Sequence, residues 1–122
     1  MKIKMYCIVA KDSLAKMNGV RGKLATQAGH AYLHASWDSE KRFPEILQAY
    51  KDSSHAFKIT LVVPTVDDLL ILQKAYEPIC GVSLVTDAGF TCFKEPTTTC
   101  LGIGPISEDM VGNDLNDLKP LT

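Results

Sequence analysis

The sequence predicts an α/β protein, a three-layer α/β/α sandwich with a mixed four-stranded sheet and helices on both faces. Two observations lead to this fold class. Segments with the period of a strand alternate along the chain with segments that have the period of a helix. The first strand segment, residues 3–9, carries apolar side chains on both of its faces, which is typical of a central strand covered from two sides.

The N-terminal half is expected to hold two strands and two helices. Pro44 suits the first turn of a helix, and Pro64 ends a segment in which every second residue from Phe57 is apolar. The expected elements are a strand at 3–9, a polar loop at 11–19, a helix at 19–38, a helix at 43–50 and a strand at 57–63.

The C-terminal half begins with a helix start signal. Thr65 and Asp68 have the spacing of a capping box, and the helix that they open must stop before Pro78. The expected elements are a helix at 65–77, strands at 81–86 and 99–104, the loop 87–98 between them, and a helical turn at 108–111.

Length and composition predict one globular domain, residues 1–122, because 122 residues can bury a core and 46% of them are hydrophobic. No run approaches the ~20 apolar residues that span a membrane, and the N-terminus lacks the features of a leader. The four cysteines are scattered without the spacing of a zinc site. We expect a cytoplasmic protein with reduced thiols and no metal.

Charge is divided unevenly along the chain. Residues 1–61 carry a balance of +5 and residues 62–122 a balance of −6. Basic residues, including Lys16 and Arg21, surround the start of the long helix, where free backbone amides and the helix dipole also favour an anion. We expect an anionic ligand there, although unconnected surface faces can produce the same division and the pI of about 6.3 is not that of a strongly basic domain.

The long helix has two different stripes. The first stripe is apolar and small, and its alanines allow close packing on a sheet; its members are Leu24, Ala28, Ala31 and Ala35. The second stripe combines a cation, an amide and two imidazoles, namely Lys23, Gln27, His30 and His34. Such a stripe indicates a chemical site, or else a solvent-exposed lysine beside two histidines at the edge of the core.

The segment Asp87-Ala-Gly-Phe-Thr91 follows a strand directly. Its carboxylate and hydroxyl are therefore expected at the carboxyl edge of the sheet, where ligands commonly bind in open α/β folds. The same residues also suit a simple turn in which Asp87 accepts from a backbone amide and Gly89 supplies a positive φ.

Four segments occur in a fixed order: GKLATQAGHA, VTDAGFT, TTTCLGIGP and the terminal DLKPL. Together they resemble the archaeal and eukaryotic type (type II) of peptidyl-tRNA hydrolase, over essentially the whole chain. The resemblance implies metal-independent hydrolysis of the ester between a peptide, or an N-blocked amino acid, and the terminal ribose of tRNA. It further implies tRNA as partner, no cofactor, and a homodimer that recycles tRNA.

The resemblance also assigns the site residues. It implies that the catalytic set is Lys23, Asp87, Thr91 and His30, and that Gln27, Thr97 and Thr99 bind the substrate; the charge pattern adds Arg21 and Lys16 to the binding set. The chain departs from the family at Phe90, Cys92, Pro96 and Thr98, where the family usually has arginine, glutamine, glycine and a basic or polar residue. These departures affect the expected affinity for tRNA more than the ester chemistry, because phosphate neutralisation supplies much of the binding energy.

The chemistry of an ester requires an activated water and a donor for the developing oxyanion. Asp87 is expected to act as base or to orient the water, Thr91 to position it, and Lys23 to stabilise charge on the carbonyl or on a phosphate. His30 either acts directly or hydrogen-bonds to the loop. Cys92 is interpreted as a packed thiol rather than a nucleophile, since no base accompanies it.

Two other functions fit the same residues. A divergent member of the fold that binds tRNA without turnover would explain the departures. A protein-interaction module would use the apolar helix from Thr65 to Glu77 as its contact surface. The same helix, with its apolar run Leu69 to Leu72, is the expected homodimer surface. The joint presence of Lys23, Gln27, Asp87 and Thr91 favours the enzyme.

Overall fold

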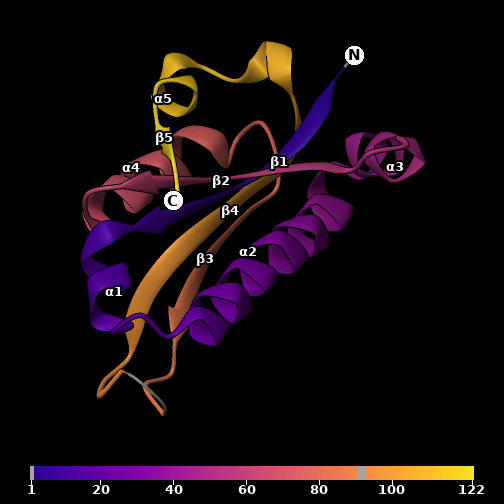
Figure 1. Ribbon diagram of the computed structural model, residues 1–122. Helices are drawn as coiled ribbons and strands as arrows, with labels where there is room; N and C mark the ends of the chain where they lie inside the picture. Colours follow the sequence, from indigo (N-terminus) through magenta and orange to yellow (C-terminus); the bar gives the residue numbers. More distant parts are fainter. Residues whose placement is uncertain (1, 91–92) are drawn as a thin grey trace.

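The computed structural model describes residues 2–90 and 93–122 (Figure 1). In chain order the elements are β1 (Ile3–Ala10), α1 (Lys11–Lys16), α2 (Arg21–Arg42), α3 (Pro44–Asp52), β2 (Phe57–Val63), α4 (Val66–Tyr76), β3 (Val82–Asp87), β4 (Thr97–Ser107), the 3₁₀ turn η1 (Glu108–Met110), α5 (Asn113–Asn116) and β5 (Lys119–Pro120). The α/β class is confirmed. No helix in these two ranges is both long enough and apolar enough to cross a bilayer.

The sheet is mixed and has the strand order β3-β4-β1-β2-β5. β1 pairs in parallel with β2 and antiparallel with β4, so the prediction that the first strand is central is confirmed. The prediction of four strands is wrong, because β5 adds a fifth by pairing with Leu61 and Val62 of β2. β5 has only two residues, one of them proline, so its sequence shows no alternation of apolar and polar residues. It is a strand only because it pairs with β2.

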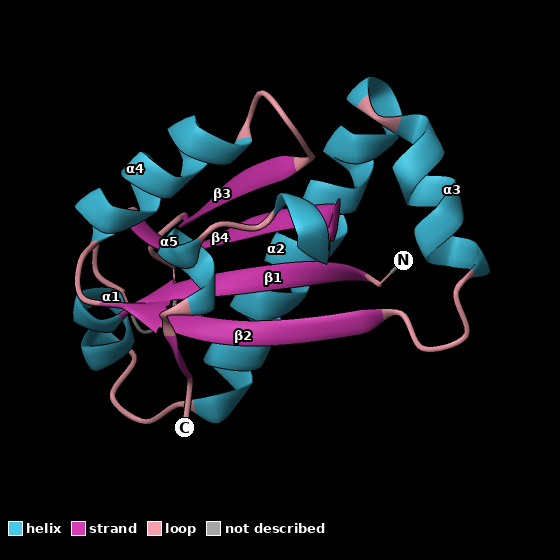
Figure 2. Cartoon of the chain, turned by 90° about the horizontal axis from the view of Figure 1, so that it is seen from above, coloured by secondary structure: helices cyan, strands magenta, loops and turns pink. Residues whose placement is uncertain are grey.

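Alternate residues of β1 face two separate cores. Tyr6 and Ile8 pack in a cluster with Leu69 of α4, whereas Cys7 and Val9 pack in a cluster with Ala31 of α2. Helix α2 therefore covers one face of the sheet and α4 covers the other, as Figures 1 and 2 show. This arrangement is the three-layer sandwich that the apolar first strand predicts.

The small-residue stripe of α2 lies against β4. Ala31 and Ala35 are fully buried, and a Cβ atom at Gly102 of β4 would overlap the carbonyl oxygen of Ala31. Such an approach requires alanine on the helix and glycine on the strand, since any larger pair would separate the two backbones. The close contact fixes the height of α2 over the ends of β3 and β4, where the candidate site lies.

The segment expected to be a polar loop at 11–19 instead begins with α1. Ser13 and Met17 are buried, and the Ser13 hydroxyl donates to the Thr98 carbonyl at 2.5 Å. A helix of six residues is too short to reveal its period among polar neighbours. Asn18 and Gly19 have positive φ values of 51° and 75°, a conformation that commonly follows the end of a helix.

Helix α2 extends four residues beyond the expected end at Asp38. The Asp38 carboxylate accepts from the Arg42 guanidinium at 2.6 Å, and Arg42 also donates to the carbonyl oxygens of Glu77 and Cys80. These contacts with the chain before β3 stabilise a last turn that local sequence does not specify. The helix ends at Arg42 because Pro44 disfavours a helical conformation at Phe43.

The remaining elements follow the sequence closely. The capping box of Thr65 and Asp68 is present at the start of α4, and the helical turn expected at 108–111 is observed as η1. β4 is longer than expected, because Thr97, Thr98 and Pro105 to Ser107 also lie in the strand.

Candidate active site

The candidate site lies where the first turns of α2 meet the end of β3 and the start of β4. Figure 1 shows the beginning of α2 and the connection between β3 and β4 at the same end of the molecule. Lys23 and Gln27 are one turn apart on α2, and Asp87 is the last residue of β3. Residues separated by about 60 positions in the sequence therefore share one small volume.

Lys23 and Asp87 form an ion pair, with 2.5 Å between Nζ and Oδ2. Only 14% of the Lys23 side chain and 10% of the Asp87 side chain are exposed. The Lys23 ammonium also lies 5.7 Å from the centre of the Phe93 ring, within the range of a cation–π contact. The ring and the carboxylate together hold the ammonium in place beside the end of β3.

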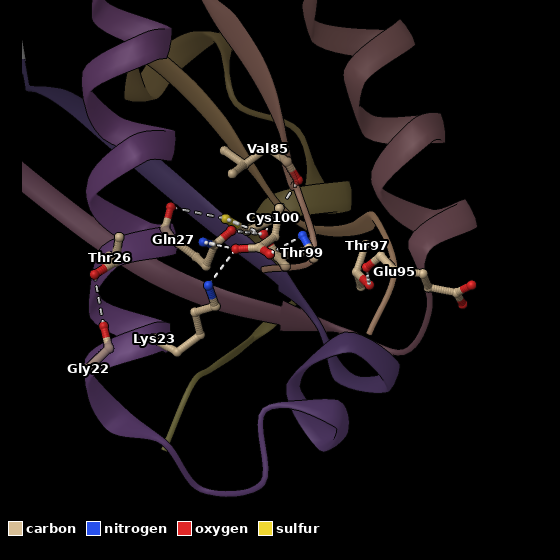
Figure 3. Close-up of polar contacts among 11 residues, drawn as sticks. Gly22, Lys23, Thr26, Gln27, Val85, Glu95, Thr97, Thr99 and Cys100 are labelled. Atoms are coloured by element: carbon tan, nitrogen blue, oxygen red, sulfur yellow. Dashed lines mark hydrogen bonds and ion pairs between the residues drawn. The ribbon is translucent and has the colours of Figure 1, made fainter. Parts of the chain in front are cut away.

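The Gln27 amide is fixed from two sides. Its Nε2 donates to Asp87 Oδ2 at 3.2 Å, and its Oε1 accepts from the Thr99 hydroxyl at 2.7 Å. Figure 3 shows Gln27 and Thr99 turned toward each other between α2 and β4. Gln27 is 3% exposed and Thr99 is fully buried, so Thr99 reaches the site through the amide of Gln27.

The turn after β3 is also the Asx turn that the sequence allows. Asp87 Oδ1 accepts from the Gly89 amide at 2.8 Å, and Gly89 has a φ of 88°. The two interpretations of this segment are therefore compatible, since one carboxylate oxygen shapes the turn while the other binds Lys23 and Gln27. Among the described residues, three donors occupy three of the roughly four acceptor positions of the carboxylate, and one position on Oδ1 receives no hydrogen bond from them.

Electrostatics keep Asp87 ionised. The hydrogen bond from Lys23, followed by the one from the Gly89 amide, lowers the pKa of the Asp87 carboxyl below its ordinary value. A carboxylate with a lowered pKa is a weak base at neutral pH, so its geometry suits orienting a water better than accepting a proton outright.

The lowered pKa predicts how activity responds to acid. Asp87 has a lower pKa in the folded than in the unfolded chain, so it stays ionised near neutrality and becomes protonated only below the ordinary range of an aspartate. A profile of kcat/KM should show no acid limb from Asp87 between pH 5 and 8. An acid limb near pH 6 that disappears in Asp87→Asn would contradict the ion-pair assignment.

The predicted binding residues Lys16 and Thr97 lie close to this centre. Both line a hollow of ≈ 470 Å³ whose wall includes Phe93, the ring beside Lys23, together with Lys94. Arg21 is exposed at the first position of α2, and Val20 before it provides no side-chain cap for the amides of the first turn. The surface next to the ion pair therefore combines cations with free helix amides.

One of the expected catalytic residues, His30, is not joined to this network, and another cannot be placed in it. Thr91 and the neighbouring Cys92 lie outside the described residues. His30 is exposed and stacks on His34, and it makes no side-chain hydrogen bond to any residue in the described ranges. The contacts therefore bring together Lys23, Gln27 and Asp87, with Thr99 beneath them.

Sequence inspection did not identify Phe93 as part of the site. The residue is 3% exposed and lies in the connection between β3 and β4, where no periodicity indicates burial. The other cysteines, Cys7, Cys80 and Cys100, are free and buried, and Cys100 donates to the Gln27 carbonyl at 3.3 Å. Within residues 2–90 and 93–122, no group of three acidic, histidine or cysteine side chains is placed to hold a metal ion.

The fold and the site define a class of protein: an α/β sandwich with a partly buried lysine–aspartate pair at its strand ends. Comparison with known sequences identifies one family within this class. The profile of the family described as "Peptidyl-tRNA hydrolase PTH2" matches residues 3–121. The chain belongs to this family.

Several proteins that carry the name peptidyl-tRNA hydrolase are similar over almost their full length. A relative from Methanothermobacter thermautotrophicus is 37% identical over 121 residues, covering 98% of this chain and 100% of the relative. A relative from Sulfolobus acidocaldarius is 34% identical over 125 residues, with 98% and 100% covered. The protein from Thermoplasma volcanium is 29% identical over 106 residues, 86% of each chain.

Proposed function

We propose that the chain is a peptidyl-tRNA hydrolase, which cleaves the ester between a peptide, or an N-blocked amino acid, and the terminal ribose of tRNA. The observation that carries this proposal is the Lys23–Asp87 ion pair, held by Gln27 at the strand ends. Family membership supports the same reaction. Hydrolysis returns free tRNA, so the proposed cellular role is recycling of tRNA and ribosome rescue in the cytoplasm, by a single domain of residues 1–122.

The proposed mechanism assigns one role to each side chain of the network. Asp87 binds the attacking water through the free position on Oδ1 and aligns it with the ester carbonyl. Lys23 offers its remaining N–H groups to the carbonyl oxygen as negative charge develops. The water oxygen bonds to the carbonyl carbon, the bond from that carbon to the ribose oxygen breaks, and the proton that the water loses ends on the departing ribose oxygen. Gln27 keeps the carboxylate in one orientation, because its own amide is fixed by Thr99.

The remaining predicted residues have supporting roles in this proposal. Thr91 is proposed to position the water or the leaving ribose, and Thr97 to contact the substrate from the hollow beside Phe93. The reaction is proposed to proceed without metal, since Lys23 supplies the positive charge that a metal would otherwise provide. The deciding experiment measures release from N-acetyl-aminoacyl-tRNA with a chelator present and compares it with free aminoacyl-tRNA.

Two basic residues, Lys16 at the end of α1 and Arg21 at the start of α2, are proposed to bind tRNA phosphates. Arg21→Ala and Lys16→Ala should each weaken binding and reduce the slope of log affinity against log salt by roughly 0.9 for each phosphate that the variant no longer neutralises. Titrations of tRNA at several salt concentrations measure this slope. Lys74→Ala provides the control, because Lys74 is an exposed lysine on α4, across the sheet. Unchanged slopes in both variants would mean that the phosphates bind elsewhere.

The exposed side of α4 is proposed as a homodimer surface. Leu69 and Leu72 are buried in the core, whereas Leu70 is 44% and Ile71 67% exposed, and Ile79 and Met110 are also exposed. Isolated proteins seldom leave such a group of apolar side chains in water. Sedimentation should show two chains per particle for wild type and one for Ile71→Glu. Leu33→Glu, which alters an exposed leucine on α2, should remain dimeric; a monomeric wild type would refute the proposal.

A further inference from the structure

Three aromatic rings form a ladder on the outside of α2. The ring centres of His30 and His34 are 5.4 Å apart and those of His34 and Trp37 are 5.1 Å apart, with interplanar angles of 29° and 24°. The ladder is largely open to solvent, because His30 is exposed and Trp37 is 53% exposed. Exposing an indole in water is unfavourable, so stacked rings in this position suggest a surface kept available for a ligand.

The ladder continues the stripe of α2 that carries the site. His30 follows Lys23 by seven residues, which is almost two full turns and about 10 Å along the helix axis. His34 and Trp37 follow at spacings of one turn, leading away from the ion pair. His30 is therefore the end of the ladder nearest to Lys23 and Gln27. His34 covers one of its faces, and the other face is the one that a ligand bound at the site would meet.

The chemistry of the surface favours a nucleobase over an aliphatic side chain. The exposed Leu33 lies beside the ladder and lines the same hollow as Trp37, but the ladder itself consists of stacked flat rings. Flat rings bind bases by stacking, a mode that single-strand binding proteins combine with nearby cations. Here the cations are Arg21, the first residue of the same helix, and Lys16, the last residue of α1. In the proposed substrate the ester is carried by the ribose of the 3′-terminal adenosine. A base stacked on His30 would lie beside Gln27, leaving its ribose to reach toward Lys23 and Asp87.

We propose that His30, backed by His34 and Trp37, stacks on the terminal adenine of tRNA and so places the ester at the Lys23–Asp87 pair. This inference rests on the proposed function and names the part of the substrate that the ladder binds. It assigns His30 a contact with the substrate through its ring face. The alternative role of His30, proton transfer through a ring nitrogen, requires an imidazole, whereas stacking requires only a flat ring.

The test uses the trinucleotide C-C-2-aminopurine, whose terminal base is fluorescent and is quenched on stacking. Wild type should quench it at low salt. His30→Ala should weaken binding by about 5- to 150-fold, the range measured when an aromatic partner of a base is removed. His30→Phe should restore binding to within a few-fold, and His34→Ala, which uncovers the back of His30, should cause a smaller loss.

His55→Ala is the matched control. His55 is another exposed imidazole packed on an aromatic ring, that of Phe57, and it lies in the connection between α3 and β2. Figure 1 shows α3 far from the first turn of α2. Its removal should leave quenching unchanged. Trp37 is the only tryptophan of the chain, so its fluorescence reports independently on what the ladder binds.

Four results would overturn the inference: no binding of the trinucleotide, binding without quenching, equal binding by His30→Ala, or equal weakening in His30→Phe and His30→Ala. A response of Trp37 to an N-acetylated peptide but not to the trinucleotide would assign the ladder to the peptide and also overturn it. Turnover of N-acetyl-aminoacyl-tRNA is measured in parallel. If the enzyme hydrolyses its substrate but the trinucleotide does not stack, only the inference about His30 is wrong. If the trinucleotide stacks but no hydrolysis occurs, only the proposed hydrolase activity is wrong.

Discussion

Asp87→Asn should fold normally and lose nearly all turnover of N-acetyl-aminoacyl-tRNA. The substitution keeps the shape of the side chain but removes the charge that pairs with Lys23 and replaces one of the two acceptor oxygens, on which the proposed orientation of the water depends. Loss of a group of this kind typically costs about 10²–10⁴-fold in rate. Single-turnover measurements with saturating enzyme would separate this loss of rate from any change in substrate binding.

Lys23→Ala and the double variant complete the experiment. Removal of one oxyanion donor costs about 10²–10³-fold, and the two substitutions together should cost little more than Asp87→Asn alone, because residues that act as one unit do not add. Thermal unfolding of all variants is the folding control. Activity within a few-fold of wild type in folded Asp87→Asn would exclude Asp87 from the mechanism and leave Thr91 and His30 as candidates. An inactive wild type would favour the non-catalytic member of the fold.

Gly102→Ala should cause a large loss of stability, although it adds only a single methyl group. The new Cβ would overlap the carbonyl oxygen of Ala31 and lie 3.0 Å from the Ala35 Cβ, and neither backbone can move without separating α2 from β4. Overpacking of this kind costs about 3 kcal/mol of the free energy of unfolding, which corresponds to a fall in Tm of roughly 10 °C. Activity should fall as well, because a shift of α2 carries Lys23 and Gln27 away from Asp87.

Gly29→Ala is the matched control, and it should raise the stability instead of lowering it. Gly29 lies on the same helix, and a Cβ there would meet no atom within 4 Å. Alanine in a helix interior is about 0.5–1 kcal/mol more favourable than glycine, so this variant should melt at a higher temperature than wild type. Scanning calorimetry of both variants gives the comparison. A melting temperature for Gly102→Ala within roughly 2–3 °C of wild type would show that α2 can move away from β4 at little cost.

Local pattern was sufficient for most of the fold. The two-sided apolar pattern of residues 3–9 determined a central strand, and the capping box at Thr65 determined where α4 begins, because both signals depend only on neighbouring residues. The sequence also determined that Lys23 and Gln27 lie on one side of α2, because the period of a helix alone places them there. The resemblance to the family motifs then predicted that this stripe and Asp87 belong to the same site.

Tertiary structure decided the features that depend on contacts between distant segments. β5 is a strand only because β2 offers it a free edge, the last turn of α2 depends on Arg42 reaching the chain before β3, and α1 is held by Ser13 on β4. No local pattern encodes such contacts, because each requires a partner tens of residues away. In the site, the sequence determined which side chains are present. Their distances, the support of Gln27 by Thr99 and the burial of Phe93 were decided by how closely α2 packs on β4.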